Sequence, residues 1–298
     1  MKKTLLCILG PTAVGKTATA IKLAQALNTE IISADSRQFF QEISIGTAKP
    51  SVEELTQAKH HFIGHLSIHQ PYSAGDFERD ALLKLDELFK QHDVVIAVGG
   101  SGLYVKALID GLDDMPKADE NLRNELNQLF ATQGIEPLQQ QLLLLNPDLY
   151  NQTEILNPQR VMRAIEIALA IKTGFVPNTK KHKRNFNVIK VVIDLPREVL
   201  YDRINKRVDV MMQQGLLNEA QSMLPHRDNY ALQTVGYKEL FEYFDGLYSL
   251  EKAVDLIKQH TRNYAKRQIT WFKKEAPDFW FSPDQTQEIL ALLHDKAN

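Results

Sequence analysis

The 298-residue sequence has little cysteine, no long apolar run and no charge of dominant sign. A single cysteine, Cys7, excludes an internal disulfide and a cysteine-based zinc site. Lys and Arg number 35 and Asp and Glu number 37, so nucleic acid could be bound only through a local basic patch. No apolar segment approaches the ~18 residues of a membrane span, and the start of the chain predicts a buried strand rather than a signal peptide. We therefore expect a cytoplasmic protein that acts as a monomer.

Apolar residues make up 44% of the chain, which is enough for a sizeable core. In the first third of the chain, segments whose apolar residues have the spacing of a strand alternate with segments that have the spacing of a helix. We predict strands at Thr4–Leu9, Glu30–Ser33 and Asp93–Val98, and helices at Thr17–Leu27 and Asp80–Gln91. This alternation predicts an α/β fold, in which helices cover both faces of a parallel sheet.

The alternation stops after residue 112. Helical patterns then fill Asn121–Gln133, Pro137–Leu145 and Pro158–Lys172. A strand pattern returns at Val188–Leu195, and helices follow at Arg197–Gln214, Leu216–Leu224, Thr234–Phe244 and Leu250–Trp271. We predict a core built from residues 1–112 and 186–298, with an all-helical subdomain inserted at 113–185.

Residues 10–17, GPTAVGKT, match the phosphate-binding pattern G-x-x-x-x-G-K-[ST]. They lie between a predicted strand and a predicted helix, which is the context that this pattern requires, and they make the expected sheet P-loop NTPase-like. The loop residues expected to surround a phosphate are Gly10, Pro11, Thr12, Ala13, Val14, Gly15, Lys16 and Thr17. Lys16 would reach phosphate oxygens and the Thr17 hydroxyl would ligate Mg²⁺. A nucleoside triphosphate or a small organic diphosphate would satisfy the loop equally.

Two segments should meet the phosphate loop at the carboxyl ends of the strands. Asp35 follows the second strand, where a carboxylate can either accept a proton from a nucleophile or cap a helix. Gly99, Gly100 and Gly102 follow the third strand and indicate a close approach to a ligand or a tight turn. An ATPase would usually carry an acidic residue there, so this run weakens an ATPase interpretation.

Basic residues recur on two predicted helices. Arg203 and Arg207 share one face and could close over phosphates, as in small-molecule kinases, or simply face solvent. Lys258, Arg262 and Lys266 recur every four residues near the end of the chain, with aromatic residues between them. The pattern fits an RNA backbone, although an ordinary solvated helix would also produce it.

Taken together, these segments resemble one family, the bacterial tRNA dimethylallyltransferases. The matching segments are GPTAVGKT (10–17), DSRQ (35–38), IGTAKP (45–50), HH (60–61), YSAGDF (72–77), VGGSGLY (98–104), NPQRVMRAIEI (157–167), the helix at 203–215, VGYKEL (235–240) and TRNYAKRQITWF (261–272). They follow the family's order over most of the chain. One departure is Ser101, where the family usually has threonine, so the hydroxyl is kept.

The resemblance implies transfer of the dimethylallyl group of dimethylallyl diphosphate to N6 of adenosine 37 of tRNA, with Mg²⁺ as cofactor. Catalytic roles would fall on Asp35 as base and on Lys16, Thr17, Ser101, Arg203 and Arg207, the last two being equally suited to the lid. The residues that would contact tRNA are Asp35, Ser36, Arg37, Gln38, Ser101, Arg123, Gln159, Arg160, Val161, Met162, Arg163, Arg262, Lys266 and Arg267. The alternatives are a P-loop kinase of a nucleoside or small metabolite and a non-catalytic RNA-binding protein.

Overall fold

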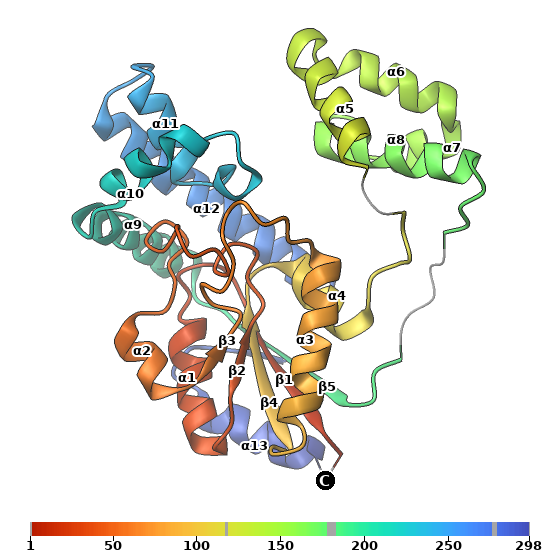
Figure 1. Cartoon of the computed structure of the whole chain (residues 1–298). Helices are drawn as coiled ribbons and strands as arrows, with labels where there is room; N and C mark the ends of the chain where they lie inside the picture. The colour runs from red at the N-terminus through yellow and green to blue at the C-terminus, as the bar shows by residue number, and fades with distance from the viewer. Residues whose placement is uncertain (1, 117–118, 178–182, 276–278, 298) are drawn as a thin grey trace. The chain divides into compact units, whose positions relative to one another are not determined.

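The computed structural model describes residues 2–116, 119–177, 183–275 and 279–297. The chain divides into two compact units, residues 1–111 with 183–298, and residues 112–182. We call them the core unit and the inserted unit (Figure 1). No helix in the described part of the chain has the length and apolar character that crossing a membrane demands.

A six-stranded parallel sheet in the order β3-β2-β4-β1-β5-β6 forms the centre of the core unit and confirms the predicted fold class. The strands are β1 (Thr4–Leu9), β2 (Ile31–Ser33), β3 (His60–His61), β4 (Val94–Gly99), β5 (Asn187–Ile193) and β6 (Phe279–Phe281). All residues of β1 and β4 are buried, because helices cover both faces of the sheet.

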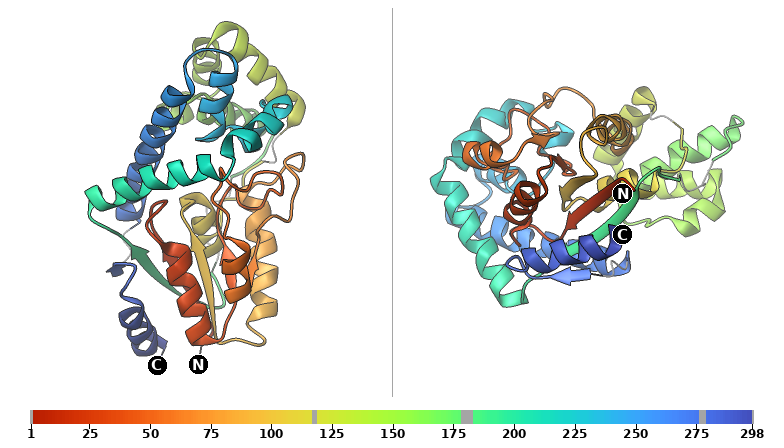
Figure 2. Two further views of the ribbon diagram at one scale, coloured as in Figure 1. Left: turned by 90° about the vertical axis from the view of Figure 1, so that its left-hand side faces the viewer. Right: turned by 90° about the horizontal axis from the view of Figure 1, so that it is seen from below.

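The helices of the first half are α1 (Lys16–Leu27), α2 (Val52–Gln57), α3 (Ala74–Leu88) and α4 (Gly102–Asp110). The crossover direction reverses between β1–β2 and β3–β4, which puts α1 and α3 on opposite faces of the sheet (Figures 1 and 2). Helix α3 begins six residues before the predicted Asp80, because Ser73 and Asp76 form a capping box. Helix α4 was not predicted.

The second half of the core unit is mainly helical. It contains α9 (Arg197–Gln213), α10 (Leu216–Met223), α11 (Tyr237–Phe244), α12 (Leu250–Lys274) and α13 (Thr286–Ala297), with the 3₁₀ turns η1 (Leu224–His226) and η2 (Tyr230–Leu232). Helices α1 and α13 share one apolar core with the sheet, and the residues of this core include Leu6, Ile8, Ile21 and Leu293. The N-terminus of α11 lies three residues after the predicted Thr234.

The inserted unit consists of α5 (Glu120–Gln133), α6 (Glu136–Leu145), α7 (Pro147–Gln152) and α8 (Pro158–Lys172). Its own core gathers Leu126, Leu138, Leu142 and Ile165. A separate core allows this unit to hold its shape independently of the sheet.

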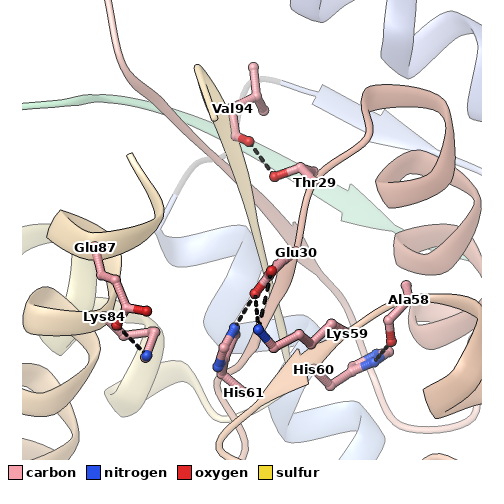
Figure 3. Close-up of polar contacts among 9 residues, drawn as sticks. All are labelled: Thr29, Glu30, Ala58, Lys59, His60, His61, Lys84, Glu87 and Val94. Atoms are coloured by element: carbon pink, nitrogen blue, oxygen red, sulfur yellow. Dashed lines mark hydrogen bonds and ion pairs between the residues drawn. The ribbon is translucent and has the colours of Figure 1, made fainter. Parts of the chain in front are cut away.

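The paired histidines form the short edge strand β3, where their side chains have structural partners (Figure 3). His61 Nε2 lies 2.5 Å from a Glu30 carboxylate oxygen, which also forms an ion pair with Lys59 at 3.2 Å. His60 Nδ1 lies 2.8 Å from the Ala58 carbonyl oxygen. The His61–Glu30 contact ties the edge strand to the residue that precedes β2. Among the described residues, no group of three or more His, Cys, Asp or Glu side chains is arranged to hold a metal.

Candidate active site

A cavity of about 630 Å³ opens in the core unit at the carboxyl ends of β1, β2 and β4. Thr12, Asp35 and Gly100 come from the segments that follow these three strands, and α9 and α12 supply further walls. The predicted site residues that line it are Thr12, Lys16, Thr17, Asp35, Ser36, Arg37, Gln38, Arg207 and Arg267. The cavity therefore brings together side chains from distant parts of the sequence.

The phosphate loop has the backbone that its pattern requires. Gly10, Ala13 and Gly15 all have positive φ, at 142°, 63° and 111°, and α1 begins at Lys16. A Cβ on Gly10 would lie 2.4 Å from the Ile193 carbonyl oxygen, so this position also permits the loop to cross β5 closely. The Val14 side chain belongs to the apolar core and takes no part in the cavity.

Lys16 carries the strongest electrostatic perturbation of the loop. Burial, together with the positive charge of Arg207, lowers its pKa to about 7, and the Asp35 carboxylate partly opposes this shift. Its Nζ donates to the Pro11 carbonyl oxygen at 2.6 Å. An anion in the loop would offset the cost of burying the ammonium group, so binding of a diphosphate should favour its protonated form.

We therefore expect diphosphate binding above pH 7 to be accompanied by proton uptake. At pH 8 the free lysine is mainly neutral and the bound one charged, so uptake should approach about one proton per site and vanish below about pH 6. Calorimetry in buffers of different ionisation enthalpy measures it. Lys16→Arg, which is charged in both states, is the control, and equal uptake by both proteins would contradict the assignment.

Asp35 forms a turn rather than a helix cap. Its Oδ1 accepts from the backbone N–H groups of Arg37 and Gln38 at 2.9 and 3.3 Å, and residues 36–39 are not helical. The next residue, Ser36, donates its N–H to the Ser101 Oγ at 3.0 Å. Ser101, which does not line the cavity, thus holds the segment that carries Asp35.

Tyr264 of α12 lies beside this segment. Burial raises the pKa of its hydroxyl to about 12, and the negative charge of Asp35 contributes in the same direction. The hydroxyl, which forms a hydrogen bond with the Ser101 side chain, therefore keeps its proton at neutral pH. The neutral Tyr264 hydroxyl beside the Asp35 carboxylate could orient a polar group of the molecule that accepts the transferred group.

The structure separates the two arginines of α9, between which the sequence did not discriminate. Arg207 lines the cavity, and burial lowers its pKa. Arg203 instead donates from Nη1 to the Val14 carbonyl oxygen at 3.1 Å. Arg207 therefore faces the space beside Lys16, whereas Arg203 contacts the backbone of the phosphate loop.

Sequence analysis missed the residue that joins the phosphate loop to the segment that follows β4. The Gln268 side chain of α12 accepts from the Thr12 N–H at 2.9 Å and donates to the Gly100 carbonyl oxygen at 2.9 Å. A Cβ on Gly100 would lie 2.4 Å from Gln268 Nε2, and one on Gly102 would lie 2.5 Å from the Trp271 ring. These glycines therefore accommodate α12 rather than provide positive backbone angles.

A second missed residue, Glu219 of α10, fixes the segment around Gly46. Its carboxylate accepts from the N–H groups of Ser44, Ile45 and Gly46 at 2.8 to 2.9 Å and from the Tyr237 hydroxyl at 2.5 Å. Lys49 of the same segment is half-buried and donates to the Phe40 and Gln41 carbonyl oxygens. One wall of the cavity is thereby held by two half-buried charged side chains.

The basic residues of α12 have different partners. Lys258 pairs with Asp209 at 2.6 Å, and Arg262 donates to the Asn205 side chain at 2.6 Å, so both join α12 to α9. Lys266 lines a second, shallower cavity of about 620 Å³, together with Tyr201 and other residues. Arg267 lines the main cavity. The helix therefore presents different basic residues to different surroundings.

In the inserted unit, the predicted RNA-contacting arginines surround a buried acid. Arg123 donates to Glu166 from Nε and Nη2, each at 2.8 Å, and Arg163 donates to the same carboxylate at 2.7 Å and to the Pro116 carbonyl oxygen. Gln159 and Arg160 are exposed. Val161 and Met162, to which the resemblance also assigned tRNA contacts, are core residues with exposures of 0% and 1%.

Removing both arginines should destabilise the inserted unit more than removing their acid. Arg123→Ala with Arg163→Ala leaves Glu166, 4% exposed, without a countercharge, which typically costs about 3–5 kcal/mol. Glu166→Gln leaves two arginines that can turn to water and should cost less. Hydrogen exchange of residues 120–172 measures the difference, and the reverse order would contradict it.

Comparison with known proteins decides the family. The family model described as IPP transferase matches residues 38–275. The chain belongs to the IPP transferase family. Within this family, a tRNA dimethylallyltransferase of Christiangramia forsetii is 50% identical over all of both chains. One of Flavobacterium johnsoniae is 50% identical over 98% of this chain and 96% of that one. The crystal structure of a tRNA isopentenylpyrophosphate transferase from Bacillus halodurans is 37% identical, with a TM-score of 0.73 over 99% of this chain and 97% of that one.

The residues of this cavity fit a magnesium ion that is coordinated mainly by a bound diphosphate. Thr17 and Asp35 supply a hydroxyl and a carboxylate to the wall of the same cavity. Mg²⁺ bound with phosphates usually takes only one or two protein oxygens and keeps several waters. The site therefore suits a metal that enters with a diphosphate.

Proposed function

We propose that the cavity transfers the dimethylallyl group of dimethylallyl diphosphate to N6 of adenosine 37 of tRNA. The observation that carries this proposal is a single cavity in which the phosphate loop, Arg207 and Asp35 meet. It provides a place for a diphosphate and a proton acceptor beside it. The family relatives favour this function over the kinase alternative, since those reported above carry the names of tRNA prenyl transferases.

The donor diphosphate would lie in the phosphate loop, on the N–H groups that precede α1. Charge accumulates on the diphosphate as the bond between its oxygen and the allylic carbon breaks. Lys16 and Arg207 face the cavity from two elements and would stabilise that charge. Mg²⁺, held by Thr17, would supply further charge stabilisation when bound.

The acceptor nitrogen would approach from the side of Asp35. A bond forms between N6 and the allylic carbon, and the proton that N6 loses passes to the Asp35 carboxylate. Tyr264 and Ser101 would position the adenine and the Asp35 segment respectively. Because the cavity lies within the protein, the adenosine has to leave its base stack to reach it.

The wider RNA contact would involve both units. Exposed Gln159 and Arg160 and the outer parts of Arg123 and Arg163 are available in the inserted unit, while Arg37, Gln38 and Arg267 line the cavity. The exposed Lys266 and the half-buried Arg262 would add phosphate contacts on α12. We further propose that the protein acts as a monomer in the cytoplasm, where a tRNA substrate would be available.

Parallel assays test this function. The purified protein with Mg²⁺ receives unmodified tRNA bearing adenosine 37 and radiolabelled dimethylallyl diphosphate in one reaction, and γ-labelled ATP with small-molecule acceptors in another. We expect label to enter tRNA from the prenyl donor alone. Transfer from ATP to a small molecule, without prenyl transfer, would refute the proposal in favour of a kinase.

A further inference from the structure

An exposed aromatic ring stands next to the segment that carries Asp35. Tyr230 is 64% exposed, and the guanidinium carbon of Arg37 lies 4.3 Å from the centroid of its ring. Arg37 lines the cavity and follows Asp35 by two residues. The ring therefore lies at the cavity's edge and not on a remote surface.

The backbone beneath this ring is fixed. Tyr230 opens the 3₁₀ turn η2, whose other residues, Ala231 and Leu232, are buried. The Asn229 side chain accepts from the Ala231 N–H at 2.9 Å and donates to the Ile68 carbonyl oxygen at 2.8 Å. Because the backbone at Tyr230 is held in one conformation, less conformational entropy is lost when the ring binds a ligand.

Arg37 is also held in place. Its N–H donates to Asp35 Oδ1 and its Nη1 donates to the Ser36 carbonyl oxygen at 3.1 Å. Because the guanidinium covers one face of the Tyr230 ring, the exposed area of the ring belongs mainly to its other face and its edges. Tyrosine rings and arginine planes are the groups on which unpaired RNA bases stack.

We propose that Tyr230, backed by Arg37, is a stacking platform for one unpaired base of the RNA, a direct neighbour of the target adenosine. This inference rests on the proposed function in taking RNA as the ligand. When the target base enters the cavity, its neighbour loses a stacking partner, and the open face of Tyr230 replaces that partner. The platform reads no hydrogen-bonding edge, so it accepts any base with an aromatic face.

A binding cycle tests the platform without using catalysis. The ligands are anticodon stem-loop hairpins that are intact or lack the base on one side or the other of the target adenosine. The proteins are wild type, Tyr230→Ala, Tyr230→Phe and Leu247→Ala, the last a control at a residue that is 68% exposed and outside the cavity lining. Dissociation constants are measured at one fixed salt concentration.

We expect Tyr230→Ala to bind the intact hairpin about 10-fold more weakly than wild type, and Tyr230→Phe and Leu247→Ala to bind nearly as wild type. Removing one neighbouring base should weaken wild-type binding by a similar factor and leave binding by Tyr230→Ala unchanged. Losses that multiply, or a Tyr230→Ala variant that binds as wild type, would overturn the platform. Prenyl transfer to the intact hairpin is measured separately, so its absence with this binding pattern would count against the proposed function alone.

Discussion

Asp35→Asn is expected to slow prenyl transfer from bound substrates by ~10²–10⁴-fold, the usual range for removing a general base. Asparagine keeps an oxygen that can accept from the N–H groups of Arg37 and Gln38, so the turn should survive. It cannot take the proton that N6 releases. The measurement is the single-turnover rate of label transfer to tRNA with both substrates saturating.

Binding measurements separate this loss from a structural one. The dissociation constants of Asp35→Asn for tRNA and for dimethylallyl diphosphate should stay near those of wild type, since the turn is intact. Ser101→Ala, which removes the acceptor for the Ser36 N–H but keeps the carboxylate, should cost less in rate. A wild-type transfer rate in Asp35→Asn would exclude the side chain from the proton step.

The parts of the site that the sequence predicted are those that follow from strand order. The exact bounds of β1 and the position of Lys16 follow from a buried apolar run and a glycine-rich turn, both local signals. Asp35 could be placed near them because the carboxyl ends of parallel strands lie at one edge of a sheet. No contact between distant residues had to be known.

The residues that were missed act across long sequence separations. Gln268 forms hydrogen bonds with Thr12 and Gly100, and Glu219 with the backbone around Gly46. The sequence near Gln268 and Glu219 gives no indication of these distant partners. The glycine run also concealed α4, since a helix that begins at Gly102 contradicts the usual propensity. Packing of Trp271 against that glycine outweighs the propensity there.

The residues at 159–163, which the resemblance assigned to tRNA contact as one block, differ in their exposure. A motif matched as a block assigns one role to consecutive residues, but a helix turns them to different sides. Gln159 and Arg160 face solvent while Val161 and Met162 enter the core of the inserted unit. Helical period therefore decides which residues of the block remain available to a ligand.

Arg207→Ala is expected to slow the transfer step by ~10²–10³-fold, the loss typical when one group that stabilises transition-state charge is removed. Arg207 lines the cavity with Lys16, and its positive charge disfavours the charged form of Lys16. A leaving diphosphate relieves this repulsion, so the pair should act most strongly when negative charge is greatest. Single-turnover rates at saturating donor report that stage directly.

Arg203→Ala is the matched variant on the same helix face, one turn earlier. It loses a hydrogen bond to the Val14 carbonyl oxygen, which supports the phosphate loop in the free and bound enzyme alike. Its effect should therefore fall on the KM for the donor, by about 10-fold, with little change in the single-turnover rate. If Arg203→Ala slowed the saturated rate as much as Arg207→Ala, the division of roles between the two arginines would be wrong. If only Arg207→Ala slowed it, the charge facing the cavity would be the one that drives diphosphate departure.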